Sequence, residues 1–416
     1  MRVRLLFRPW YHMPKNILII NEYAGSPSYG MTFRHYYFAK EFMKKGHHTI
    51  IVSASFSHFL KRYPDMKGLS YKQETVEGVD FLWIKVLKYT KSFDIKRAFK
   101  WLDFTWKLFF IGKALPTKPD VIICSTTELF AIVPAYYLSK KYKAQLVFEV
   151  RDIWPLTLIE IGGFSKHNIF IRVMAWLEKF SLQKSDILIS NLSHYSKHLH
   201  DLNIHRDVHW IPNGIDLDEM EHRENLPELL KSSIPRDKFV VGYTGKLGTS
   251  NALLFLLQAA RMLRNNRDIV FVLVGSGQEE ENLKSYAADL ENVVFMEAIP
   301  KIQIQSMLQL FDVCYLGLQK KDLFKFGISP NKLYDYMLSG KPILQAINIQ
   351  NDIVEISGCG LCVQAEDANA IVDAIKIFYS MPKEMRKQLG EKGRAYVLQN
   401  FTYDRLAQAY LSCLSI

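Results

Sequence analysis

The clearest chemistry in the chain belongs to one short segment with a helix start and charged side chains. Ser329 has a hydroxyl that can cap a helix, and Pro330 suits the first helical position, where its missing N–H group costs nothing. Asn331 and Lys332 add donors at this helix start, where unpaired backbone N–H groups and the positive end of the helix dipole attract phosphate. Asp335, about one turn further, can accept two sugar hydroxyl groups. This order suits a nucleotide-sugar, although an ordinary capped helix explains the same residues equally well.

Glycine-flanked loops after predicted strands offer further contacts for a phosphate. Lys246 follows a predicted strand in the sequence Thr-Gly-Lys-Leu-Gly, and with Gly245 beside it is well placed to reach a phosphate. A second loop follows the next predicted strand, and its backbone can hold a base or a phosphate at Gly275, Ser276 and Gly277. A turn of this kind also serves any junction between a strand and a helix.

The first half of the chain has candidates of its own. The predicted strand 145–150 ends in Arg151 and Asp152, and charged residues in that position lie at the rim where doubly wound folds bind ligands. A structural Arg–Asp pair is the alternative interpretation. The loop after the predicted strand 16–20, with the helix that follows it, could present residues to a cleft, with a core or solvated role as the alternative: Gly25, Tyr29, Gly30, Arg34 and His35.

Neither the acids nor the cysteines predict a metal site. Asp216 and Asp218 form a D-x-D pair, which elsewhere suggests a metal–diphosphate clamp, but two nearby acids are common in proteins. Cys359 and Cys362 formally match C-x-x-C, but they have no second pair and no nearby histidine. We therefore expect a reduced, cytoplasmic protein without a metal or other cofactor.

The elements that must position these residues alternate between apolar strands and helices. Strand 16–20, helix 31–45 and strand 48–53 form a βαβ unit, which implies a parallel sheet. A polar segment at 221–237 is typical of a linker, and the alternation then starts again. With 416 residues the chain is too long for one typical core, so two domains of about 200 residues are expected.

The charge of the chain favours an anionic partner. Its net charge of +11 suits a phosphate-bearing substrate, an anionic lipid or a nucleic acid, but no motif supports a nucleic acid. Residues 1–15 and the helical pattern at 91–113 combine basic and aromatic side chains, which favours contact with lipid headgroups. An edge-packed extension and a core helix are the alternatives. No apolar run is long enough to predict a transmembrane span, and the first residues are too charged for a signal peptide.

Taken together, these motifs resemble those of the group 1 (family 4) glycosyltransferases, especially the branch that serves O-antigen and capsule assembly. The segments that carry the resemblance follow the family's order: Glu22–Gly30, Arg151–Pro155, Ile211–Asp216, Gly242–Gly248, Gly275–Gly277, Ser329–Pro342 and Gly390–Arg394. The resemblance implies the α/β GT-B fold, in which two doubly wound Rossmann-like domains face a central cleft. It divides the chain into an acceptor-binding domain at 1–206, a nucleotide-sugar donor domain at 207–395 and a helix at 396–416 that crosses back.

The resemblance also implies roles for single residues. The family's basic diphosphate contact maps to Lys246, and its acidic ribose contact, usually Glu, maps to Asp335. Two positions depart from the family: Gly327 replaces a frequent acid, and Arg151 stands where many relatives have His. Asp152 is then the leading candidate for the catalytic residue. Lys246 and the helix start would stabilise the leaving diphosphate.

These observations predict a retaining glycosyltransferase at the inner face of the cell membrane. By resemblance, it would move a sugar, an N-acetylated hexosamine, from a UDP-sugar to a lipid-linked saccharide, without a metal. A UDP-sugar epimerase on the same fold is the first alternative; it would need several acids in the cleft and no lipid acceptor. A non-catalytic membrane-bound scaffold is the second alternative, and it predicts no affinity for nucleotides.

Overall fold

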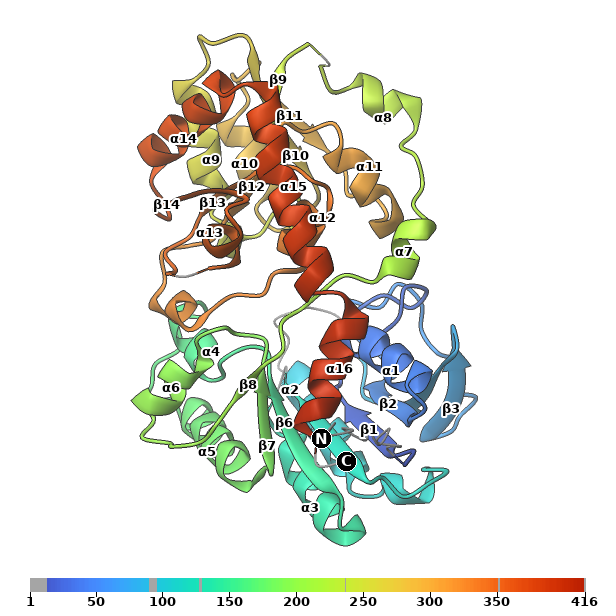
Figure 1. Ribbon diagram of the computed structural model, residues 1–416. Coiled ribbons are helices and arrows are strands. Elements are labelled where there is room, and N and C mark those ends of the chain that lie inside the picture. The colour runs from blue at the N-terminus through green and yellow to red at the C-terminus, as the bar shows by residue number, and fades with distance from the viewer. Residues whose placement is uncertain (1–12, 90–95, 127–128, 236, 351, 415–416) are drawn as a thin grey trace, which may run out of the picture.

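Two sheets, each covered by helices, form the two halves of the molecule (Figure 1). The computed structural model describes residues 13–89, 96–126, 129–235, 237–350 and 352–414. The basic segment 1–15 therefore lies almost entirely outside the described residues, as does the start of the segment 91–113. The GT-B architecture expected from the sequence is confirmed.

The first half is an eight-stranded sheet whose strands are parallel except at one edge. Its spatial order is β3 (Tyr71–Val76), β4 (Val79–Ile84), β2 (His48–Ala54), β1 (Asn16–Ile20), β5 (Val121–Ser125), β6 (Gln145–Val150), β7 (Ile187–Ser190) and β8 (His209–Trp210). The helices of this half are α1 (Arg34–Lys44), α2 (Lys96–Leu108), α3 (Ile132–Tyr142), α4 (Leu156–Glu160), α5 (Ile169–Lys184) and α6 (Tyr195–Asp201). Because β8 pairs with β7, this sheet extends past residue 206, where the sequence had placed the boundary.

The second half is a six-stranded parallel sheet. Its spatial order is β11 (Val293–Met296), β10 (Ile269–Val274), β9 (Phe239–Thr244), β12 (Val313–Gly317), β13 (Ile343–Ala346) and β14 (Gly360–Val363). The helices from here to the end of the described chain are α7 (Leu217–Glu221), α8 (Glu228–Ser232), α9 (Leu253–Met262), α10 (Glu280–Tyr286), α11 (Ile304–Leu308), α12 (Asn331–Leu338), α13 (Ile353–Ser357), α14 (Ala368–Ser380), α15 (Lys383–Asn400) and α16 (Tyr403–Cys413). The helix α8 lies inside the segment that the sequence predicted to be a linker.

The strand order of each sheet positions the ligand-binding region. In the first sheet the chain builds outward from β1 on one side and from β5 on the other, and in the second it does the same from β9 and β12. Loops that leave the carboxyl ends of such neighbouring strands diverge, which opens a crevice between them. The strands themselves are almost continuously buried because helices cover both faces of a parallel sheet.

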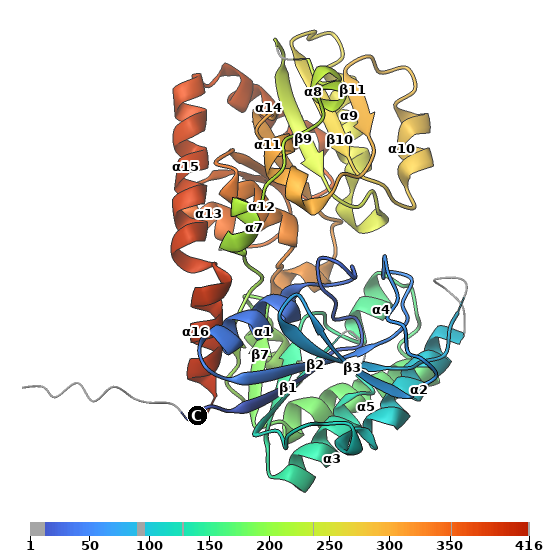
Figure 2. The ribbon, with the colours of Figure 1, turned by 90° about the vertical axis from the view of Figure 1, so that its right-hand side faces the viewer.

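The chain crosses between the two halves twice, and the crossings lie side by side. The backbone N–H of Ile215 donates to the carbonyl of Phe401 at 2.9 Å, and that of Tyr403 donates to Ile215 at 3.0 Å. After the second crossing, α16 lies along α1 of the first half (Figures 1 and 2). Phe38 of α1 contacts the rings of Tyr403 and Tyr410, with centroids 5.3 and 5.2 Å away. This packing ties the end of the described chain to its beginning.

Candidate active site

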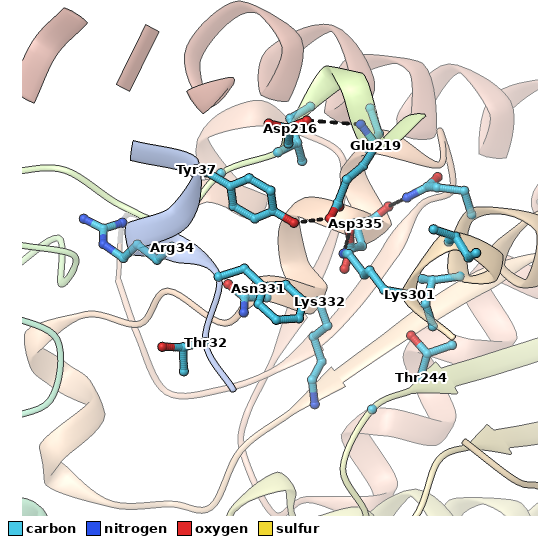
Figure 3. A pocket seen from close by; sticks show the side chains of 18 of the residues that line it. Thr32, Arg34, Tyr37, Asp216, Glu219, Thr244, Lys301, Asn331, Lys332 and Asp335 are labelled. Carbon is cyan, nitrogen blue, oxygen red and sulfur yellow. Dashed lines mark hydrogen bonds and ion pairs between the residues drawn. The ribbon is translucent and has the colours of Figure 1, made fainter. Parts of the chain in front are cut away.

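A cleft of about 570 Å³ lies between the two halves (Figure 3). The first half contributes the start of α1 and the loop before it, and the second contributes the loop after β9 and one side of α12. Five of the residues predicted from the sequence line this cleft: Arg34, Gly245, Asn331, Lys332 and Asp335. The cleft therefore brings together residues about 300 positions apart in the chain.

Arg34 lines the cleft, but its guanidinium group is fully engaged by the protein. Two of its nitrogens donate to Oε1 of the buried Glu149 at 2.8 and 2.7 Å. The third nitrogen, Nη1, donates to the backbone carbonyl of Pro212 and to the side chain of Asn213, and Nη2 also donates to the backbone carbonyl of Ile211. Burial alone would raise the pKa of Glu149, but the charge of Arg34 and a hydrogen bond from His35 hold it well below its usual range. Arg34 thus fastens α1 to the first crossing segment.

The other residues predicted around α1 contribute to packing, so their prediction as cleft residues is wrong. His35 is 2% exposed, and burial lowers the pKa of its ring to about 4, which keeps it neutral beside Glu149. Tyr29 is buried and its hydroxyl donates to Glu74 at 3.0 Å. At Gly25 an added Cβ would lie 1.8 Å from the carbonyl oxygen of Gly30, so this loop is closed on itself.

The start of α12 differs from the capped helix that the sequence predicted. The helix begins at Asn331, after Pro330, and no side chain caps it. The hydroxyl of Ser329 instead accepts a hydrogen bond from the backbone of Asn213 at 2.8 Å and lies 2.9 Å from the hydroxyl of Tyr334. The backbone N–H groups at the start of α12 are therefore left without a side-chain cap, at a point where Asn331 is exposed to the cleft.

Lys332 extends away from Asp335, toward the loop after β9 (Figure 3). Its ammonium group donates to the hydroxyl of Tyr243 and to the side-chain oxygen of Asn251, both at 2.7 Å. Neither partner is charged, and burial lowers the pKa of Lys332 to about 7. The ammonium group lies beneath Gly245, since an added Cβ there would be 3.3 Å from it. It is thus a cation without a counter-charge below a glycine loop.

Asp335 meets partners that the sequence did not indicate. Its carboxylate forms an ion pair with Lys301, which follows β11 and lines the same cleft. Nearby, the hydroxyl of Tyr37 in α1 donates to Glu219 in α7, and burial raises the pKa of Glu219 (Figure 3). Lys301 could have been found from its position after a strand end, where ligands bind in this type of sheet. Glu219 follows the D-x-D pair in a polar stretch and carries no such signal.

Two glycine loops pack against each other beside the cleft. At Gly275 an added Cβ would lie 1.8 Å from the carbonyl oxygen of Gly245, and at Gly277 it would lie 2.2 Å from that of Leu247. Gly275, Ser276 and Gly277 line neither this cleft nor the second cavity described below. Lys246 also lines neither the cleft nor the second cavity. Its side chain is exposed next to the cleft residue Gly245. Among the described residues, its ammonium group has no hydrogen bond or ion pair.

A second cavity of about 330 Å³ adjoins the cleft, and Asn331 lines both. Arg151 and Asp152 line it from the first half, directly after β6. Gly327, Ser329 and Pro330 line it from the second half. The residues predicted from both halves therefore meet, but in two adjoining spaces.

Lysine side chains of α1 pair with both carboxylates of the D-x-D pair. Lys40 lies 3.3 Å from the carboxylate of Asp216 and 2.8 Å from that of Asp218, and Lys44 also pairs with Asp218. These ion pairs join α1 to the start of α7. Within the described ranges, no three His, Cys, Asp or Glu side chains are grouped as metal ligands.

Two family models match the two halves of the chain. The one described as "Glycosyltransferase Family 4" matches residues 30–219, and the one described as "Glycosyl transferases group 1" matches residues 238–380. Among curated proteins, the chain is 24% identical over 331 residues to the colanic acid biosynthesis glycosyl transferase WcaI of Escherichia coli (strain K12), which covers 75% of this chain and 79% of the relative.

Solved structures of other proteins have the same fold. Sucrose-phosphate synthase from Thermosynechococcus elongatus matches with a TM-score of 0.74 and 15% identity, over 96% of this chain and 98% of that one. HepE from Anabaena, solved in complex with UDP and glucose, matches with a TM-score of 0.67 and 15% identity, over 96% of this chain and 99% of that one. Identities of this size show the fold alone.

Proposed function

Because the chain belongs to the group 1 and family 4 glycosyltransferases and has the GT-B fold, we propose that it transfers a sugar from a UDP-sugar to a lipid-linked saccharide, with retention of configuration. The product belongs to a cell-surface polysaccharide, as colanic acid does in the named role of the Escherichia coli relative. The transferred sugar is proposed to be an N-acetylated hexosamine, and the reaction to need no metal.

One observation carries this proposal: the cleft brings the uncapped start of α12 and the glycine loop after β9 together opposite α1. Backbone N–H groups at a helix start bind phosphate, and two cations lie close to this point. Lys332 has only neutral partners, and Lys246 is exposed beside Gly245. A diphosphate at this point would supply the missing negative charge.

From this position of the diphosphate we propose where the rest of the donor lies. Asp335, held by Lys301, would accept hydrogen bonds from the ribose hydroxyls on one side of the diphosphate. The transferred sugar would extend into the second cavity, between Asp152 and the backbone of Gly327–Pro330. As the bond to the diphosphate breaks, negative charge grows on the leaving oxygen, where the α12 start and Lys246 stabilise it. Asp152 would orient the sugar at the reacting carbon.

The lipid-linked acceptor requires the first half to reach a membrane. No helix among the described residues is long and apolar enough to cross one. Large apolar side chains are nevertheless exposed on α2, α3, α5 and the turn after α2: Phe99, Leu102, Trp106, Phe110, Tyr137, Ile169, Val173 and Trp176. These three helices lie on the side of the first sheet away from the second half (Figure 2). With Lys140 and Lys141 exposed on α3, this face suits the headgroup region of an anionic membrane.

An epimerase is the alternative to the proposed transferase, because three acids line the cleft: Asp216, Glu219 and Asp335. Proton abstraction requires a carboxylate that is free to accept a proton from the sugar. Each of these three already contacts Lys40, Tyr37 or Lys301. These contacts favour the transferase.

The test is the release of nucleotide diphosphate from a panel of UDP-, GDP- and dTDP-sugars, with and without a membrane lipid extract. The proposal expects release that needs one UDP-sugar and the lipid, and a loss of at least about tenfold in Asp335→Ala. Conversion of the sugar without lipid would establish the epimerase. A protein that neither binds nor turns over a nucleotide would be the scaffold instead.

A further inference from the structure

Two side chains that line the second cavity, Arg151 and Asn191, have buried polar atoms without a hydrogen-bond partner among the described residues, and Arg151 is the charged one. Its Nε and Nη1 atoms are shielded from solvent and have no hydrogen-bond partner among the described residues. Glu149, the buried acid two positions earlier, is already paired with Arg34. Buried charged groups in proteins are normally paired, because an unpaired one loses its hydration without compensation. The fold therefore maintains an unfavourable arrangement at this position.

Two other arginines show how the chain satisfies a guanidinium group when its role is structural. Arg34 donates to Glu149 and to two backbone carbonyls. Arg206 donates to the carbonyls of Leu182, Ser185 and Asp186 at 2.6 to 2.9 Å. Arg151, by contrast, lines a cavity, and its Nε and Nη1 atoms have no acceptor among the described residues.

The surroundings of Arg151 leave room for an anion. Across the cavity, Gly327 has a φ of +108°, and an added Cβ would lie 2.4 Å from the backbone nitrogen of Ser193. An acidic side chain at that position is therefore excluded. Among the described residues that line the cavity, Asp152 is the only acid, and the other polar side chains are neutral: Thr157, Asn191, Asn213, Ser329 and Asn331.

We propose that the second cavity binds an anionic oxygen group of a substrate, a carboxylate or a phosphate, through the guanidinium group of Arg151. The planar fork of donors in arginine matches either group with two parallel hydrogen bonds. The proposal rests on the function proposed above, in which the UDP moiety occupies the adjoining cleft. Two parts of the substrates can then bring the anion: a carboxylate on the transferred sugar, or the phosphates that join the acceptor to its lipid.

Titration calorimetry with matched probes tests this assignment and separates the two sources. UDP-glucose and UDP-glucuronic acid differ only at C6, where the second carries a carboxylate. If the sugar brings the anion, the wild type binds UDP-glucuronic acid at least about tenfold more tightly, and Arg151→Met removes that preference. If the acceptor brings it, both donors bind alike, and UDP-loaded wild type binds geranyl diphosphate at least about tenfold more tightly than UDP-loaded Arg151→Met does. An Arg151→Met variant that matches the wild type with both kinds of probe would overturn the proposal.

The binding of UDP alone tests the underlying function separately. Wild type and Arg151→Met should bind it equally, because the nucleotide lies in the other cavity. A wild type that does not bind UDP would overturn the proposed function, and this inference with it.

Thermal unfolding without ligand distinguishes a binding role from a structural one. Arg151→Met removes no internal hydrogen bond of the side chain, so its melting temperature should equal or exceed that of the wild type. The matched control Arg206→Met removes bonds to three carbonyls and should melt at a lower temperature. If the melting temperature of Arg151→Met falls as far as that of Arg206→Met, Arg151 is a structural residue and the assignment is overturned.

Discussion

At the scale of single residues, two cations are notable because their side chains form no ion pair among the described residues. Lys332 is enclosed beside Tyr243 and Asn251, and Arg151 lines the second cavity. Burying such a group is unfavourable, and a bound anion would compensate that cost. This pattern is typical of a binding site, because stability is lost where function needs an unsatisfied group.

Lys332 gives the protein a pH-dependent stability that can be measured. Its pKa is about 7 in the folded protein, because of burial, and about 10.4 in an unfolded chain. Between these two values the unfolded chain binds more protons, so the free energy of unfolding should rise with pH. We expect the wild type to gain stability relative to Lys332→Met between pH 7 and pH 9 in urea unfolding. A difference between the two proteins that stays constant over this range would contradict the lowered pKa.

The sequence predicted which residues gather at the site better than it predicted their contacts. Asn331, Lys332 and Asp335 line the cleft because a helix start after an extended loop is a local property. The direction of the Lys332 side chain depends on Asn251, 81 positions earlier, and no local pattern encodes that. The contact of Ser329 was missed for the same reason. The sequence predicted that Ser329 caps α12, but its hydroxyl bonds to Asn213 instead, and this contact forms only once both halves are folded.

At the scale of elements, α2 is fixed by a buried ion pair. The ammonium group of Lys100 lies 2.5 Å from the carboxylate of Glu22, just after β1, and both side chains are 0% exposed. Lys100 is one of the basic residues of the helical pattern at 91–113, for which the sequence predicted contact with lipid headgroups. The pairing of Lys100 with Glu22 turns the helix and leaves Phe99, Leu102 and Trp106 exposed.

Replacing one partner of this ion pair should destabilise the protein more than replacing both. Lys100→Met removes the ammonium group that faces the buried carboxylate of Glu22 and should cost about 3–5 kcal/mol in the free energy of unfolding. The double variant Glu22→Gln/Lys100→Met should recover most of that loss in chemical denaturation. Lys284→Met, which removes the exposed pair with Glu280, serves as the control and should leave stability nearly unchanged. Equal losses in the single and double variants would show that the charge pair does not hold α2.

The exposed face of α2 makes a prediction about membranes. Trp106→Glu/Phe110→Glu replaces two exposed aromatic rings with charges and should lower binding to phosphatidylglycerol-containing vesicles by about tenfold or more. Ile377→Glu, on the exposed side of α14 in the second half, should bind like the wild type. Co-sedimentation with the vesicles measures both. If the two variants bind equally well, this face does not contact the membrane.

The elements themselves were predictable where their pattern is local. Continuous apolar runs predicted β1, β9 and β10, because these strands are buried on both faces. The strand β3, with the sequence Tyr-Lys-Gln-Glu-Thr-Val, was missed. It is an antiparallel edge strand, and its hydrogen bonds to β4 define it more than its own largely polar residues do.

At the scale of the whole molecule, two adjacent crossings and α16 couple the halves. Because Ile215 is hydrogen-bonded to Phe401 and Tyr403, the two crossings lie directly beside each other. Rings from both ends of the described chain then pack together. Tyr410 lies 5.2 Å from Phe38 and 5.5 Å from Phe42, measured between ring centroids.

Substitutions at Tyr410 test how much this packing contributes to the stability of the protein. Tyr410→Ala removes a buried ring and should lower the free energy of unfolding by about 3–5 kcal/mol. Among the described residues, its hydroxyl has no hydrogen-bond partner, so Tyr410→Phe should be at least as stable as the wild type. Urea unfolding of the two variants measures the difference. If Tyr410→Phe were as unstable as Tyr410→Ala, the hydroxyl and not the ring would hold α16.

The position of α16 also determines how long α1 remains uncovered during protein synthesis. Phe42 and Tyr410 are about 370 residues apart in the chain. At the usual rate of protein synthesis, a ribosome takes roughly 20 to 70 s to make that length. For this interval α1 has been made and the helix that covers it has not. The nascent first half therefore exposes an aromatic surface while the entire second half is being translated, which is a natural binding site for chaperones.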